Sequence, residues 1–385
     1  MNDAAVGAGA PLIRRAPLAA EEDLELGLGL CLSGGGFRAM LFHAGSLWRL
    51  NEAGYLPRLD RVSSVSGGSI TAGVLALSWN ELDFGSDRIA ANFPDVVVAP
   101  LRKLAAKTID VPAVLLGGLL PFITVNDRLA RSYRRLFGKR DLRDLPDRPE
   151  FVFDATSLQS GDLWRFSKRA EGDWRVGSRL TPDTPLARVV AASSAFPPLL
   201  SPARLSYPPA GLEAGADPAL SDARYRRKVR LVDGGVYDNL GLEAVWSSCR
   251  QVLISDAGGH MAAAVRPRVL WPLQLLRVLQ VIDNQVRDLR KRQAVLSYVE
   301  GQRTGAYWGI RSHVRDFGLS DPIARPSDAA VQALAGIATR LAGLGETVQE
   351  RLLNWGYAMA DTALRAHVEP RQPPGTLPYP AAGLS

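Results

Sequence analysis

Three short glycine-rich segments of this 385-residue chain combine residue types that hydrolytic chemistry needs. The first is residues 33–38 (SGGGFR), where Gly34, Gly35 and Gly36 follow an apolar run. Glycines at a strand-to-helix turn leave backbone N–H groups free to point at an anion, and the helix N-terminus adds positive potential there. The segment therefore predicts a site for a phosphate or for the oxyanion of a tetrahedral intermediate.

The second segment is residues 64–68 (SVSGG), which places Ser66 between a short predicted strand over residues 61–65 and a helical pattern. A serine on such a turn, followed by the small residues Gly67 and Gly68, has the arrangement of a nucleophile elbow. The start of the following helix favours the developing alkoxide. The alternative is a polar turn with no chemical role.

The third segment is Asp233-Gly234-Gly235, directly after the apolar residues 229–232. A carboxylate at a strand end can take the proton of a serine hydroxyl that attacks an ester. The alternative is an Asx-turn, in which the aspartate caps the loop. For the other polar residues nearby we expect capping roles: Asp238, Asn239 and Asp256.

The first eighty residues predict the elements that position these segments. A buried strand over residues 24–32 leads through a glycine turn to a helix over 37–53. A second strand over 61–65 leads through Ser66 to a helix over 69–79. This βαβα order favours a parallel sheet covered by helices.

The rest of the chain contains fewer clear patterns. Residues 203–222 are rich in Pro, Ala and Gly and predict a surface loop. Residues 273–295 predict an amphipathic helix with five apolar residues on one face, and residues 327–368 predict one or two more helices. Further strands are predicted over 151–155, 164–167, 229–232 and 251–255. The five apolar residues are Leu276, Leu279, Ile282, Val286 and Leu289.

Residues 32–54, 62–73, 191–202 and 231–241 together resemble the patatin-like phospholipases, over roughly residues 24–259. The resemblance implies a three-layer α/β/α sandwich with a mainly parallel central sheet. It also implies an enzyme with a Ser-Asp dyad that hydrolyses acyl esters of phospholipids and related lipids through an acyl-enzyme. No metal or cofactor is implied for that chemistry.

The resemblance carries over to individual residues. Ser66 matches the nucleophile, Asp233 the general base and Arg38 the arginine of the first motif. Two positions depart from the pattern: Ala39 replaces the glycine that ends the first motif, and Ser64 replaces the first glycine of Gly-x-Ser-x-Gly. Both replacements are small, so we expect the turns to survive. The oxyanion hole is expected from Gly34, Gly35 and Gly36, with Gly67, Gly68, Gly234 and Gly235 in support.

Two other sites are compatible with parts of the sequence. Gly34-x-Gly36 with Ala39 resembles part of a dinucleotide-binding fingerprint, but no acidic residue ends the strand over 61–65. A Ser-His-Asp triad needs a histidine late in the chain, and His260 is the strongest candidate. Arg38 is compatible with orienting the glycine loop, with binding a phosphate, or with a surface ion pair.

The functional alternatives are acyl transfer to an alcohol, a lipase effector activated by a partner, and a non-catalytic lipid-binding module. The formal charge of +7 favours anionic partners, and we expect an acyl lipid rather than nucleic acid. We expect a cytoplasmic protein that contacts membranes peripherally. Residues 111–125 are compatible with an apolar membrane flap beside Arg102, Lys103 and Lys107, or with a pair of core helices.

The sequence also suggests a division of the chain. We expect a loose tail over 1–22, a catalytic domain over 23–260, a helical region over 261–368 and a flexible tail over 369–385.

Overall fold

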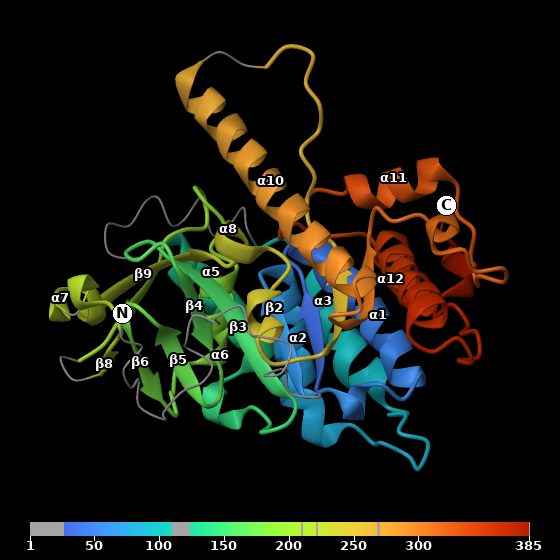
Figure 1. Cartoon of the computed structure of the whole chain (residues 1–385), viewed down its shortest axis with the longest axis horizontal. Helices are drawn as coiled ribbons and strands as arrows, with labels where there is room; N and C mark the ends of the chain where they lie inside the picture. Colours follow the sequence, from blue (N-terminus) through green and yellow to red (C-terminus); the bar gives the residue numbers. More distant parts are fainter. Residues whose placement is uncertain (1–26, 110–123, 209–210, 221, 268–269, 385) are drawn as a thin grey trace.

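The structure is a computed structural model, and it describes residues 27–109, 124–208, 211–220, 222–267 and 270–384 (Figure 1). The membrane flap predicted over residues 111–125 falls almost entirely outside these ranges. The strands are β1 (Leu28–Leu32), β2 (Arg61–Val65), β3 (Glu150–Ser157), β4 (Leu163–Phe166), β5 (Ala170–Asp173), β6 (Gly177–Leu180), β7 (Ala203–Ser206), β8 (Glu213–Ala214), β9 (Lys228–Asp233), β10 (Gln251–Asp256) and β11 (Thr304–Gly309). The α-helices are α1 (Gly36–Glu52), α2 (Gly67–Ser78), α3 (Ala99–Ala105), α5 (Val125–Phe137), α6 (Leu186–Ser193), α7 (Ala223–Arg227), α8 (Gly235–Asp238), α9 (Glu243–Trp246), α10 (Trp271–Val299), α11 (Asp328–Gly336) and α12 (Glu346–His367).

One mixed sheet forms the centre of the molecule. Its middle strands follow the order β11-β10-β1-β2-β3, and each of these neighbours pairs in parallel. Beyond β3 the sheet continues through β4, β5, β6 and β8 with antiparallel pairing. The prediction of a mainly parallel central sheet is confirmed, and the antiparallel extension is an addition that the sequence did not predict.

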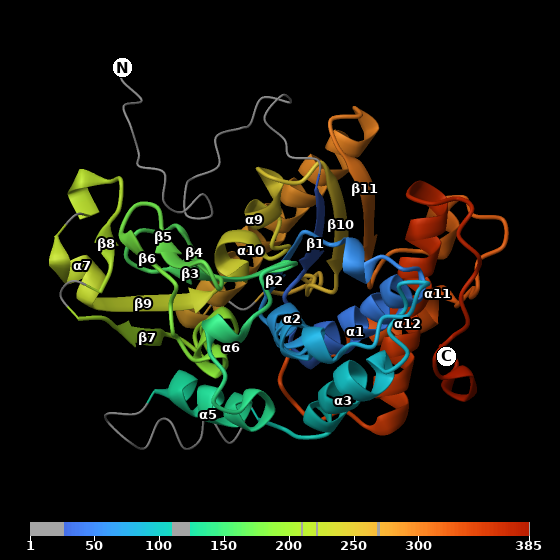
Figure 2. The same ribbon diagram turned by 90° about the horizontal axis from the view of Figure 1, so that it is seen from below.

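Helices cover both faces of the parallel strands, as Figure 2 shows. Leu30 and Leu32 of β1 join the larger apolar core on the face covered by α1, α2 and α12. Cys31, between them, joins a smaller core with Val245 of α9 and Ala294 of α10. Because neighbouring residues of a strand point to opposite faces, this alternation places one helix layer on each side. The predicted three-layer sandwich is confirmed.

The C-terminal part of the chain packs into the same body. Strand β11, which the sequence did not predict, adds to the edge of the parallel sheet beside β10. Helices α1 and α12 pack so closely that a Cβ on Gly356 would lie 1.8 Å from the carbonyl oxygen of Phe42. The predicted boundary at residue 260 remains a prediction from the sequence. In the structure, residues on both sides of it contribute to one core.

The surface loop predicted over residues 203–222 was wrong in part, because it contains β7 and β8. In β7 the buried Ala203 and Leu205 alternate with the exposed Arg204 and Ser206. That strand pairs with β9, which lies more than twenty residues further along the chain. A four-residue strand of this kind is stabilised by its distant partner rather than by local sequence.

Candidate active site

The register around β3 brings two predicted site residues to one place. Strand β2 pairs with β3 up to Val65, opposite Asp154. Strand β9 pairs with β3 from Asp233, opposite Ala155. Both β2 and β9 occupy the edge of β3 that β4 leaves free, because β4 pairs with the same β3 residues from the other side. The strands β2 and β9 therefore run head to head along β3, and Ser66 follows the last residue of β2.

The backbone at Ser66 turns sharply between β2 and α2. Its φ of 52° and ψ of −115° lie where non-glycine residues are rare, so the conformation is strained. The N–H of Ser66 donates to Ser193 Oγ at 3.0 Å, and Ser193 Oγ in turn donates to the carbonyl of Asp154 at 2.6 Å. These bonds hold the turn against β3 and do not involve the Ser66 hydroxyl.

Asp233 is a buried carboxylate with an unusual ionisation. Its side chain is 2% exposed, and burial raises its pKa to about 7 against the smaller opposing effects of the Gly235 N–H and the Ser66 hydroxyl. Oδ1 accepts the Gly235 N–H at 2.8 Å, while Oδ2 has no hydrogen-bond partner among the described residues. The Ser66 hydroxyl thus lies close enough to act on the Asp233 carboxylate, but no well-aligned hydrogen bond joins the two groups.

The glycine loop follows β1 and faces the Ser66 turn. Gly35 and Gly36 have φ of 146° and 62°, which favour glycine, and a Cβ on either would lie 2.5 Å from a backbone oxygen. The N–H of Gly34 donates to the carbonyl of Asn239 at 3.1 Å, so this amide is already engaged in the structure. Within the described ranges, the N–H groups of Gly35, Gly36 and Gly67 donate to no acceptor.

The supporting glycines allow the turns to touch. A Cβ on Gly67 would lie 2.2 Å from the Gly36 oxygen and 2.9 Å from the Gly36 nitrogen. A Cβ on Gly68 would lie 2.3 Å from the Leu32 oxygen, and one on Gly234 would lie 2.4 Å from the Asp154 oxygen. The turns that carry the free N–H groups of Gly36 and Gly67 are therefore in contact with each other, at the positive ends of α1 and α2.

Asn239 also lies at the candidate site, although the sequence predicted only a capping role for it. Its amide oxygen would lie 2.5 Å from a Cβ on Gly34 and 2.6 Å from one on Gly235, and its nitrogen 2.6 Å from one on Gly258. The side chain thus wedges between three glycine turns, and its Nδ2 is buried without a hydrogen-bond partner among the described residues. The sequence contained little sign of this arrangement, because Asn239 and Gly34 are far apart in the chain and meet only in the folded structure.

Arg38 ties the glycine loop to the C-terminal part of the chain. Its guanidinium donates to the carbonyls of Ala335 at 2.6 Å, Ile337 at 2.9 Å and Ala257 at 2.7 Å. The side chain is buried, which lowers its pKa to about 10. A surface ion pair is therefore wrong, and the contacts are those of a residue that positions the loop.

His43 supports the same loop from behind. Its Nε2 donates to the Ser33 carbonyl at 2.9 Å, so Nδ1 accepts from Ser255 Oγ at 2.8 Å. Burial lowers the pKa of His43 to about 4, so the ring is neutral near physiological pH. This histidine is a structural member of the site.

A second buried carboxylate lies close by on β3. Asp154 Oδ2 accepts from Ser63 Oγ at 2.9 Å, and burial raises its pKa to about 7 despite the nearby Arg165. Its hydrogen-bond partner is Ser63 rather than Ser66. Asp238, by contrast, has the capping role that the sequence predicted, because it accepts the N–H groups of Leu240 and Glu243.

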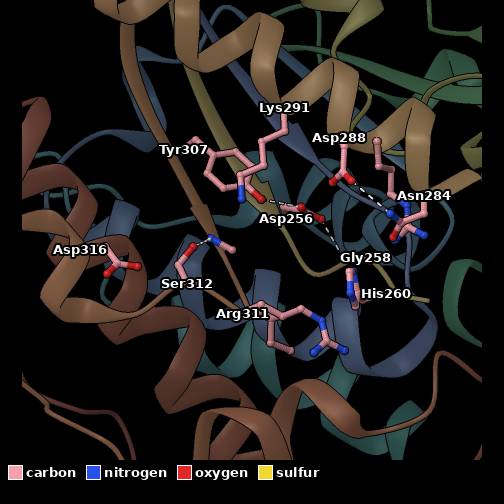
Figure 3. Close-up of a pocket in the computed structure, with 14 residues that line it drawn as sticks. Asp256, Gly258, His260, Asn284, Asp288, Lys291, Tyr307, Arg311, Ser312 and Asp316 are labelled. Atoms are coloured by element: carbon pink, nitrogen blue, oxygen red, sulfur yellow. Dashed lines mark hydrogen bonds between the residues drawn. The ribbon is translucent and has the colours of Figure 1, made fainter. Parts of the chain in front are cut away.

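A polar cavity of about 210 Å³ opens next to this site (Figure 3). Neither Ser66 nor Asp233 lines it. Its charged lining is balanced between Arg287, Lys291, Arg311 and Asp256, Asp288, Asp316.

His260 is exposed and lines this cavity, and it makes no hydrogen bond within the described residues. The other two histidines contact Asp328 (His313) and Phe317 (His367). The described part of the chain places no three His, Cys, Asp or Glu side chains together as metal ligands.

The chain was compared with models of protein families and with solved structures, and both comparisons found similar proteins. The model of the family described as patatin-like phospholipase matches residues 30–246, which is more than half of the chain. The structure is similar to human GIVD cytosolic phospholipase A2, with a TM-score of 0.52 and 14% identity over 89% of this chain and 62% of that one. It is also similar to VipD from Legionella pneumophila, with a TM-score of 0.35 and 16% identity over 89% and 67% of the two chains. The chain thus spans about three-fifths of the cytosolic phospholipase, and no curated protein matched it in sequence.

Proposed function

Because the chain belongs to the patatin-like phospholipase family, we propose that it hydrolyses acyl esters of phospholipids or related lipids, with Ser66 as nucleophile and Asp233 as general base. One observation carries this proposal. Strands β2 and β9 meet head to head along β3, which brings the strained turn at Ser66 close to Asp233, a buried carboxylate whose pKa is about 7. A base with a pKa near the working pH is well suited to accept the proton of an attacking hydroxyl.

In the first step, Ser66 Oγ attacks the ester carbonyl carbon and its proton passes to Asp233. The carbonyl oxygen becomes an oxyanion, which the free N–H groups of Gly35, Gly36 and Gly67 are placed to receive. Losing one such donor typically costs about 10² to 10³ in rate. Collapse of the intermediate breaks the ester bond, and the proton on Asp233 passes to the departing alcohol or lysolipid.

In the second step, water attacks the acyl-Ser66 ester and gives its proton to Asp233. The second tetrahedral intermediate collapses to release the fatty acid, and Ser66 Oγ recovers the proton. An alcohol in place of water would give acyl transfer by the same steps, so product analysis with an added alcohol separates hydrolysis from transfer.

The test is hydrolysis of a panel of phospholipids and neutral acylglycerols by wild type, Ser66→Ala and Asp233→Asn. We expect release of fatty acid by the wild type only. A fluorophosphonate probe should label the wild type and spare Ser66→Ala. Ser64→Ala is the matched control, because Ser64 is a buried hydroxyl two residues away that donates to Val152. Labelling of Ser66→Ala at another serine would overturn the assignment.

A further inference from the structure

Helix α10 begins in an arm that stands clear of the rest of the molecule (Figure 1). We define the arm as residues 261–267 and 270–282, which are a loop and about the first three turns of α10. Arg277 in the helix donates to the carbonyl of Ala262 at 2.7 Å and so joins the two halves. The sequence predicted an amphipathic helix here, but four of its five apolar-face residues are exposed.

The exposed surface of the arm is strongly apolar. Eight apolar side chains of its helical half are between 39% and 72% exposed, and Val265 of its loop is fully exposed. The eight are Leu270, Trp271, Leu275, Leu276, Val278, Leu279, Val281 and Ile282. Exposed apolar clusters of this size usually mark an interaction site.

The distribution of these residues points to the kind of partner. At about 100° per residue, the exposed apolar positions from 271 to 282 cover more than half of the helix circumference. A helix that pairs with one other helix needs only a narrow apolar stripe. Apolar groups on most sides suit a partner that surrounds the helix, as the acyl region of a lipid surface does.

The charges of the arm fit the same partner. The arm contains two arginines, Arg266 and Arg277, and no Asp or Glu. Trp271 lies at the outer end of the helix, and tryptophan is favoured at the boundary between lipid headgroups and acyl chains. No helix among the residues that the structure describes is long and apolar enough to cross a bilayer.

The inner end of the arm, around residue 282, lies near the candidate active site. Helix α8, which follows Asp233 after one residue, packs against α10 and exposes Val236. Asp283, the first residue past the arm, is one of the charges that act on Asp233. A lipid surface that receives the arm would therefore approach the side of the molecule that holds the candidate site.

We propose that this arm is the surface by which the protein docks onto an anionic lipid bilayer, with its apolar side chains in the outer acyl layer and its arginines among the headgroups. This proposal rests on the proposed function in one respect: lipid hydrolysis would explain why the protein docks onto a bilayer. Vesicle binding itself is measured without hydrolysis, so the two proposals are tested separately.

The experiment measures flotation with vesicles of phosphatidylcholine and phosphatidylglycerol, in a Ser66→Ala background so that the lipid stays intact. The variant Leu275→Gln/Val278→Gln/Leu279→Gln keeps good helix formers and removes apolar surface. We expect its vesicle affinity to fall at least about tenfold. The matched control changes Val295, Leu296 and Val299 to Gln, which are 38%, 54% and 78% exposed at the other end of α10. We expect the control to bind like its parent.

A second readout locates the contact. The two native cysteines, Cys31 and Cys249, are buried, so a dye on Val278→Cys reports on that position alone. Its emission should shift to the blue on anionic vesicles, and a dye on Val299→Cys should not shift. Hydrolysis of a short soluble ester by the first triple variant, with Ser66 intact, should equal that of wild type.

Three outcomes would overturn the docking proposal. One is that the parent does not float with vesicles, and another is that both triple variants lose binding equally. A third is a dimer in sedimentation equilibrium that only the first triple variant abolishes, without vesicle binding, since the partner would then be a second copy. Vesicle binding with no lipid hydrolysis by the wild type would instead refute the proposed function and leave the docking surface standing.

Discussion

We expect Asp233→Asn to inactivate the protein and yet to stabilise it above neutral pH. Because the folded-state pKa of Asp233 is about 7 against a usual 3.8, the folded state holds a proton that the unfolded state releases. The stabilising effect of that proton is complete below about pH 4 and is lost as pH rises through 7. At about 1.36 kcal/mol per pKa unit, the loss amounts to about 4 kcal/mol. Asparagine keeps Oδ1 for the Gly235 N–H and carries no charge, so the variant escapes this loss.

The assay is urea unfolding of wild type and variant at several pH values. The difference in free energy of unfolding, variant minus wild type, should rise by up to about 4 kcal/mol between pH 4 and pH 8. Over the same range, wild-type kcat/KM on a soluble ester should rise about tenfold per pH unit below pH 7 and then level off.

Asp154→Asn is the matched control, because burial also raises the pKa of Asp154 to about 7. Its free energy of unfolding relative to wild type should rise by the same amount between pH 4 and pH 8. Its activity should stay within about tenfold of wild type, since the Asp154 carboxylate accepts a hydrogen bond from Ser63 rather than from Ser66. A stability difference that stays flat from pH 4 to pH 8 would refute the buried, protonated Asp233. Hydrolysis by Asp233→Asn above about 1% of wild type would refute its role as base.

Three further substitutions test how the site is held. Gly356→Ala should lower the free energy of unfolding by about 3 kcal/mol in urea titrations, because the new Cβ would lie 1.8 Å from the Phe42 carbonyl oxygen. The control is Gly336→Ala, whose Cβ would meet nothing within 4 Å and should leave the free energy of unfolding unchanged. Arg38→Lys should lower kcat on a soluble ester about tenfold with little change in KM, since an ammonium cannot reach three separate carbonyls; an unchanged kcat would remove its positioning role. Asn239→Ala should lower kcat between about tenfold and a hundredfold, and wild-type kinetics would show that its wedge among the glycine turns is dispensable.

Local patterns predicted the first elements of the fold closely. The strand predicted over residues 61–65 has the bounds of β2, and the helix predicted over 37–53 differs from α1 by one residue at each end. The helix lies between Gly36 and Gly54, and the strand ends at the turn Ser66-Gly67-Gly68, so these limits follow from neighbouring residues. The short strands β5 to β8 and the edge strand β11 were missed because each depends on a partner that is distant in sequence or too short to show a pattern.

The candidate site divides in the same way. The sequence alone determined that Ser66 follows a strand, that Asp233 ends another, and that glycines surround both, because these are properties of adjacent residues. Only the tertiary structure decided that β2 and β9 meet head to head along β3, since that follows from pairing between segments far apart in the chain.

Tertiary packing also fixed properties that no residue carries by itself. Burial set the pKa of Asp233, and the contact with Asn239 removed Gly34 from the free N–H groups. The apolar face of α10 showed a helical period in sequence, but a period does not say whether that face is covered. Exposure depends on what the rest of the chain leaves uncovered, and here it left the arm free.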